Sequence, residues 1–160
     1  MRTRDHRLRE IESIYRSRFH HFVRVARAIT GDRERALEAV QDAFVNAVRA
    51  RASWRGDGPL EAWLWRAVVN AARQAVRRPP VESDREDEAY DPPPLLGELA
   101  PLIARLPERQ RLVVFLRYYA DLDYRTIAAA LGVEVGTVSS SLAAAHAAIR
   151  KSTSEVWTDA

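Results

Sequence analysis

Basic and amide side chains recur at helical spacing near the middle of the chain. Asn70, Arg73 and Arg77 are three and four residues apart, so on a helix they share one face. Arginine side chains bind phosphates, and an asparagine amide can pair with the edge of an unpaired base. Two further arginines, Arg66 and Arg78, flank this set. The pattern therefore predicts a contact with nucleic acid.

The sequence has none of the usual signatures of catalysis or metal binding. It contains no cysteine, which excludes thiol catalysis, a disulfide framework and Cys-ligated metal sites. None of its four histidines, which are His6, His20, His21 and His146, belongs to a metal-ligand motif such as H-E-x-x-H. There is also no glycine-rich phosphate loop and no nucleophile elbow. We therefore expect a protein that is not an enzyme and that uses no metal or cofactor.

A tryptophan, Trp54, precedes the arginine-rich segment in a loop that contains two glycines. An indole ring there could stack on an exposed base, an interaction worth roughly 1–3 kcal/mol per base. Packing against the neighbouring helices explains the same residue, because large aromatic side chains commonly bury in cores. The sequence leaves both interpretations open.

The charges of the chain fall into three blocks. Residues 1–78 carry a net charge of +8, residues 79–100 carry −6, and residues 101–160 carry +1. Residues 79–94 add five prolines to the acidic run, a composition that cannot bury apolar area and predicts a flexible linker. An alternative role for this acidic segment is to fold back on a basic surface as a mimic of nucleic acid. The blocks predict two domains, residues 1–78 and 95–152.

Apolar residues recur at three- and four-residue steps on both sides of the linker, which predicts an all-α fold. In the first block we expect three helices, with Gly31 ending the first, Asp32 capping the second and Pro59 in the first turn of the third. The expected buried face of the third helix comprises Leu60, Trp63, Leu64, Ala67, Val68, Ala71 and Ala75. The second block predicts four helices, at Leu95–Arg105, Pro107–Ala120, Tyr124–Leu131 and Val135–Lys151.

The last two predicted helices have the pattern of a helix-turn-helix. Ile127 and Ala128 face inward, Gly132 supplies a left-handed turn, and Val138 and Leu142 anchor the second helix. Such a second helix can lie in the major groove of DNA. The side chains expected to contact DNA are Arg125, Thr137, Ser139, Ser140, Ser141, Ala144 and His146. A helical hairpin without a nucleic-acid role is the alternative.

Several motifs, in this order and spacing, resemble a bacterial sigma factor. Those that resemble its fourth conserved region are LPERQRLVV (106–114), YRTIA (124–128) and VGTV (135–138). Those that resemble its second region are ITGD (29–32), EAVQDAF (38–44) and AWLW (62–65). Two such regions with only a short linker between them resemble the extracytoplasmic-function (ECF) subfamily. The resemblance covers most of residues 8–151.

The resemblance implies a protein that binds core RNA polymerase, directs it to specific promoters and helps to open the DNA. In the family, the helix face that carries Glu38, Gln41 and Asp42 here docks on a coiled coil of the polymerase β′ subunit. Their spacing alone fits an ordinary solvated face equally well. The residues that would read and open the −10 element are Trp54, Arg66, Asn70, Arg73, Arg77 and Arg78. Other implied partners are the β flap, promoter DNA and an anti-sigma factor.

The predicted recognition helix departs from the family pattern. Lysine or arginine usually follows the Gly-Thr-Val, where this chain has Ser139, Ser141 and Ala144. Because neutralisation of phosphates dominates affinity for duplex DNA, we expect this region alone to bind a −35 element weakly.

Two other functions fit parts of the sequence. One is a stand-alone helix-turn-helix regulator that binds duplex DNA without polymerase. The other is a sigma-like interaction module that occupies polymerase or an anti-sigma factor without supporting initiation. No apolar run reaches the roughly 18 residues that a membrane span needs, and the first residues lack a signal-peptide pattern. We therefore expect a cytoplasmic protein with no membrane insertion.

Overall fold

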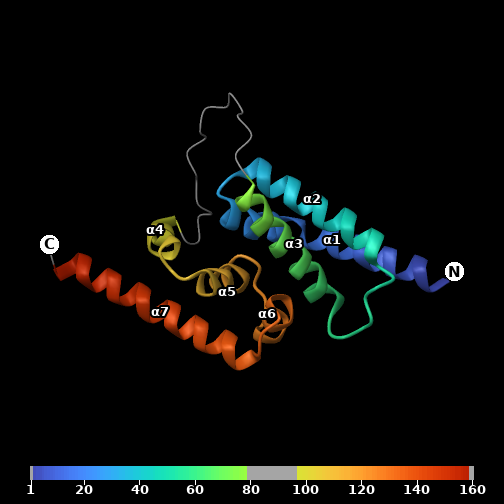
Figure 1. Cartoon of the computed structure of the whole chain (residues 1–160). Coiled ribbons are helices and arrows are strands. Elements are labelled where there is room, and N and C mark those ends of the chain that lie inside the picture. The colour runs from blue at the N-terminus through green and yellow to red at the C-terminus, as the bar shows by residue number, and fades with distance from the viewer. Residues whose placement is uncertain (1, 79–96, 159–160) are drawn as a thin grey trace.

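The computed structural model describes residues 2–78 and 97–158, and all regular secondary structure within these ranges is helical. The N-terminal half consists of α1 (Arg2–Thr30), α2 (Arg33–Ala50) and α3 (Leu60–Arg77), which pack against one another (Figure 1). The C-terminal half consists of η1 (Gly97–Leu99), α4 (Ala100–Ala104), α5 (Glu108–Tyr118), α6 (Tyr124–Leu131) and α7 (Val135–Thr158). The all-α fold is thereby confirmed, while the predicted linker at 79–94 lies outside the described residues.

Local sequence signals set several helix ends. The Asp32 carboxylate accepts a hydrogen bond from the Glu34 backbone N–H at 3.0 Å and caps α2, as the sequence predicts. Gly31 has a φ of 74° directly after α1, a left-handed conformation that glycine adopts without a steric penalty. Pro59 is the cap residue that precedes α3, one position before the first turn in which we expected it.

The core of the N-terminal half is aromatic. Trp65 on α3 and Phe22 on α1 are both fully buried, and their ring centroids lie 4.2 Å apart. Phe44 on α2 completes the cluster, with its ring centroid 5.1 Å from that of Phe22. These rings join α1, α2 and α3 and thereby fix which side of α3 faces outward.

The expected buried face of α3 was wrong in part. The structure buries Leu60, Ala62, Leu64, Trp65, Val68, Val69 and Ala72. The residues that we expected to be buried but that are only half-buried are Trp63, Ala67, Ala71 and Ala75. The physical reason is that α3 packs against α1 and α2 on one side and against α6 on another, so its buried arc is wider and rotated.

The C-terminal half packs α5, α6 and α7 around a small core, in which Leu116, Ile127 and Val138 are fully inaccessible to solvent. The bounds of α6 are those predicted from the sequence. The expected helix at 95–105 was wrong in its extent, because the chain forms the short turn η1 before α4. The last helix continues to Thr158, beyond its expected end, since no glycine or proline stops it.

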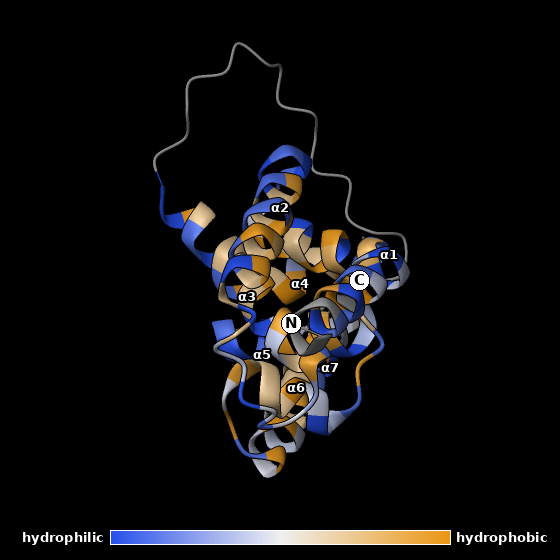
Figure 2. Cartoon of the chain, turned by 90° about the vertical axis from the view of Figure 1, so that its right-hand side faces the viewer, coloured by the Kyte–Doolittle hydropathy of each residue, from blue (hydrophilic) through white to orange (hydrophobic). Residues whose placement is uncertain are grey.

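The two halves contact each other directly. α3 packs against α6, and α1 contacts α5 (Figure 1). Their buried apolar residues form a single cluster that continues from one half into the other. Figure 2 shows hydrophobic and hydrophilic residues mixed along each helix, as expected for helices that are apolar on one side only.

Within the described ranges, no single helix is long and apolar enough to cross a membrane. Only α6 and α7 taken together pass such a test by length and composition, and they are bent by 102° relative to each other.

Candidate nucleic-acid interface

The polar face of α3 carries most of the residues predicted to contact nucleic acid. Arg66, Asn70, Arg77 and Arg78 are exposed, and Arg73 is half-buried. The opposite face of the helix is buried in the aromatic core, so the helix cannot turn these side chains inward without losing that packing. The structure therefore brings the predicted set together along one side of α3.

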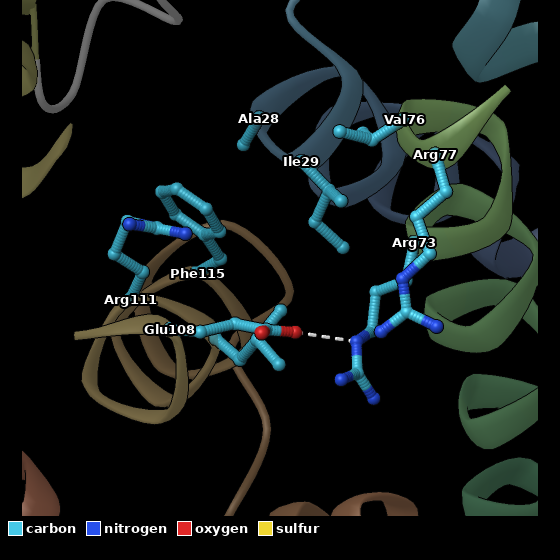
Figure 3. Close-up of a pocket in the computed structure, with 9 residues that line it drawn as sticks. Ala28, Ile29, Arg73, Val76, Arg77, Glu108, Arg111 and Phe115 are labelled. Atoms are coloured by element: carbon cyan, nitrogen blue, oxygen red, sulfur yellow. Dashed lines mark ion pairs between the residues drawn. The ribbon is translucent and has the colours of Figure 1, made fainter. Parts of the chain in front are cut away.

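Two of these arginines contact the C-terminal half. Nη2 of Arg66 donates a hydrogen bond to the backbone carbonyl of Ala129, near the end of α6, at 2.8 Å. Arg73 forms an ion pair with Glu108 in the first turn of α5 (Figure 3). Neither contact was predicted from the sequence. A backbone carbonyl has no signature in the sequence, and Glu108 lies 35 positions from Arg73 along the chain.

A cavity of about 160 Å³ lies between the two halves, beside this ion pair (Figure 3). Its lining residues are Ala28, Ile29, Arg73, Val76, Arg77, Glu108, Arg111, Leu112 and Phe115. The Arg111 guanidinium is held in place because its Nη1 donates to the Leu106 carbonyl at 2.8 Å. The cavity thus has apolar walls from α1, α3 and α5, with three arginines and one carboxylate among its lining residues.

Trp54 packs against the hydrophobic core and is half-buried. The Arg7 guanidinium lies over its ring, 5.0 Å from the centroid, and Nη1 of Arg7 donates to the Arg51 carbonyl at 2.6 Å. A cation in this position gains from the negative face of the indole ring. A base could stack on that face only after Arg7 moves away.

The residues predicted to dock on polymerase lie on the exposed side of α2. Glu38, Gln41 and Asp42 are all exposed, whereas the other side of the helix packs against α1 and α3. Val45 lies on the same exposed side, one turn after Gln41, and 48% of its surface is accessible. We did not predict this apolar residue as part of the surface, although its four-residue spacing from Gln41 was a usable signal.

The helix-turn-helix is formed by α6 and α7. The Asp123 carboxylate accepts from the Thr126 backbone N–H at 2.7 Å and caps α6, and this hydrogen bond lowers the pKa of Asp123. Gly132 ends α6 in the left-handed region, with a φ of 67°, as predicted. Because the turn and both helices match the expected geometry, the helix-turn-helix itself is confirmed.

Most of the predicted recognition residues face solvent. Arg125, Ser139, Ser140 and Ala144 are exposed, while Thr137, Ser141 and His146 are half-buried. The Ser140 hydroxyl donates to the Thr137 carbonyl of its own helix at 3.2 Å. His146 is tied to α5 through the Tyr118 hydroxyl, which lies 2.7 Å from Nε2 of the imidazole. The exposed surface of this part of α7 therefore consists of small, uncharged side chains.

One histidine lies near the contact between the halves. Burial of His21, together with the nearby charges of Arg18 and Arg24, lowers its pKa below the usual value, while Asp121 from the loop after α5 opposes this effect. Nδ1 of His21 is buried and makes no hydrogen bond within the described residues. The described residues contain no group of three or more side chains that could hold a metal ion.

Comparison with known proteins places these features in a family. The family model for Sigma-70 region 2 matches residues 14–79, and the model for Sigma-70 region 4 matches residues 96–149. The chain is 35% identical over 134 residues to the ECF RNA polymerase sigma-E factor of Escherichia coli strain K12, which covers 70% of each protein. The chain belongs to the ECF sigma factors. It is also 32% identical over 142 residues to the RNA polymerase sigma-H factor of Pseudomonas aeruginosa, covering 75% of this chain and 74% of that protein.

Solved structures show the same fold. CnrH, solved in complex with the cytosolic domain of CnrY, covers 92% of this chain and 90% of its own, with a TM-score of 0.73 at 23% identity. RpoE of Bartonella quintana, solved with the anti-sigma factor NepR, covers 89% of this chain and 95% of its own, with a TM-score of 0.66 at 18% identity. The protein is thus a sigma factor, a regulatory factor of transcription initiation, and the resemblance seen in its motifs is confirmed.

Proposed function

We propose that this sigma factor docks on the β′ coiled coil of core RNA polymerase through Glu38, Gln41 and Asp42. The observation that carries this proposal is the exposed side of α2, on which the three side chains lie together while the opposite side is buried against α1 and α3. Carboxylate and amide oxygens there can accept hydrogen bonds from basic groups of a partner helix. Val45 adds an apolar contact at the end of this polar surface, one turn after Gln41.

The polar face of α3 reads and opens the −10 element in this proposal. Arg66, Arg73, Arg77 and Arg78 bind the phosphates of the melted strand, and Asn70 contacts base edges. Trp54 stacks on an unpaired base after Arg7 releases its ring. The exposed face of α7 around Ser139, Ser140 and Ala144 then contacts the −35 element, and its lack of charge makes this contact weak on its own.

The remaining partners follow from the same assignment. The C-terminal half contacts the β flap, and an anti-sigma factor regulates the protein. The structure of RpoE with the anti-sigma factor NepR supports such a regulator for this fold. We place the protein in the cytoplasm, where core polymerase works.

In vitro transcription from a DNA library tests this function, because a library requires no choice of promoter. Core polymerase with the full-length chain is incubated with templates that carry a randomised upstream region, and the transcripts are sequenced. Recovery of a shared upstream motif, absent with core alone, is the expected result. Transcripts that show no motif above the core-alone background would contradict promoter recognition.

One observation favours a second candidate function, that of an interaction module without initiation activity. Arg66 and Arg73 are engaged by the C-terminal half, and the exposed side chains of α7 before Arg150 are uncharged. Such a module binds core polymerase but yields neither open complexes nor transcripts, so permanganate footprinting of the same reactions separates the two functions. A stand-alone regulator would instead shift duplex DNA without polymerase.

A further inference from the structure

We infer that Arg66 and Arg73 hold this sigma factor in a closed state, in which its C-terminal half and promoter DNA compete for the same face of α3. This inference rests on the proposed role of the two arginines in binding the −10 strand. It adds a regulatory contact that acts within the chain, without any partner.

The first contact uses the end of a helix as a substitute for phosphate. Ala129 lies in the last turn of α6, where backbone carbonyls have no partner within the helix and carry a partial negative charge. The Arg66 guanidinium donates to this carbonyl at 2.8 Å. A nucleic-acid phosphate would offer the same guanidinium an anionic acceptor, so the two partners compete.

Gly132 makes room for this contact. A Cβ atom at Gly132 would lie 3.1 Å from Nη2 of Arg66, so the guanidinium passes directly beside the glycine. The residue that turns the chain from α6 to α7 is therefore also part of the surface on which Arg66 rests. The helix-turn-helix and the −10 face of α3 meet at this point.

The second contact uses a carboxylate in place of phosphate. Glu108 begins α5 and pairs with Arg73, and the two side chains are 49% and 37% exposed. A pair exposed to this degree contributes little to stability, because water and salt screen it. It can therefore exchange for a phosphate at low cost.

The packing between the halves also fits an interface that separates. The cavity of about 160 Å³ lies at this interface, with Ile29 of α1, Val76 of α3 and Phe115 of α5 among its lining residues. Interfaces between the domains of one chain resemble transient contacts between proteins, and a pocket at such an interface fits this type of contact. A DNA strand that lies along Arg66 and Arg73 must displace α6 and the start of α5.

The test combines a distance measurement with a binding measurement on the full chain, without polymerase. Because the chain has no cysteine, Ser13→Cys and Ala147→Cys place two dyes on exposed positions of α1 and α7. Energy transfer between the dyes is followed while a single-stranded DNA oligonucleotide of mixed sequence is added. The same oligonucleotide is titrated against Glu108→Gln and against Glu155→Gln, which removes one negative charge from an exposed site near the end of α7.

The closed state predicts that saturating oligonucleotide lowers the energy transfer. It also predicts that Glu108→Gln binds the oligonucleotide about two- to fivefold more tightly than wild type, the range that a surface ion pair accounts for, while Glu155→Gln binds as wild type does. Equal affinities of the two variants, or unchanged energy transfer in bound protein, would overturn the inference. Neither result involves core polymerase, so failure here leaves core binding to be judged separately.

Discussion

The Tyr118 hydroxyl lies 2.7 Å from Nε2 of His146 and ties α5 to the middle of α7. This hydrogen bond links two helices of the C-terminal half through partly exposed side chains. A net contribution of about 0.5–1.5 kcal/mol is usual for such a bond. We predict that Tyr118→Phe lowers the free energy of unfolding by about that amount, as measured by urea denaturation. Tyr124→Phe, which removes a hydroxyl from another exposed tyrosine, is the control. Equal losses of unfolding free energy in the two variants would disprove a contribution from the Tyr118–His146 hydrogen bond.

Charge reversal tests the docking surface of α2. Asp42→Arg places a cation where the proposed partner is basic, so we predict a roughly ten- to hundredfold loss of affinity for core polymerase, because opposed like charges cost several kcal/mol. The fold should remain intact, since Asp42 is exposed. Glu10→Arg makes the same change on the exposed surface of α1 and should bind as wild type does. Unchanged affinity of Asp42→Arg would remove this residue from the docking surface.

The −10 role of α3 predicts a separation of binding from opening. Arg73→Ala combined with Arg77→Ala should leave affinity for core polymerase unchanged and lower open-complex formation roughly tenfold or more, because charged hydrogen bonds to DNA are lost. Permanganate reactivity of a promoter recovered from the library measures the effect. The control is Arg9→Ala with Arg105→Ala, two exposed arginines that lie outside α3. Full opening by the Arg73 and Arg77 variant would contradict the assignment.

The turn of the helix-turn-helix requires glycine at one position. We predict that Gly132→Ala costs about 1–2 kcal/mol of unfolding free energy, since a side chain is strained at a φ of 67°. Gly136 lies in the first turn of α7, where an added Cβ would meet no atom within 4 Å, so Gly136→Ala should be neutral or should stabilise the protein by up to about 1 kcal/mol. Thermal and urea unfolding of both variants measure the difference. An unchanged free energy of unfolding in Gly132→Ala would contradict the left-handed conformation of this residue.

The lowered pKa of His21 predicts a loss of stability in acid. Because burial and two arginines favour the neutral imidazole in the folded chain, the unfolded chain binds more protons at and below pH 6.5, the usual pKa. Stability is therefore fully present above that pH and is lost as the pH falls through it. Urea midpoints measured between about pH 7.5 and 5.5 should decline less in His21→Gln than in wild type or in His20→Gln. Parallel declines in all three proteins would rule out a contribution from His21.

The local parts of the fold could be predicted from the sequence. Asp32 and Gly132 mark helix ends through short-range chemistry, a side-chain cap and a left-handed turn, and both are found where they were expected. The buried side of α3 could not be fixed in this way. Its sequence is apolar over most of its circumference, and the packing of α3 against α1, α2 and α6 decides that Trp65 is fully inaccessible while Trp63 is not.

The site was predicted as a set of residues but not as an arrangement. Helical spacing placed Asn70, Arg73 and Arg77 on one face of α3, and the structure describes them there. The contact of Arg66 with the Ala129 carbonyl depends on how the two halves pack, and no pattern of residue types encodes a backbone acceptor. The exposed Val45 could have been predicted as part of the docking surface, because it lies four residues after Gln41 on the same helix.

Equilibrium binding of the full chain to purified core RNA polymerase, in competition with a known sigma factor, tests the central claim most directly. It requires no promoter DNA and depends on no single contact in α3 or α7. We predict saturable binding that the second sigma factor displaces, with Asp42→Arg displaced at lower concentrations than wild type. Binding that the competitor does not displace, or no binding at all, would contradict the proposed docking of this chain on core polymerase.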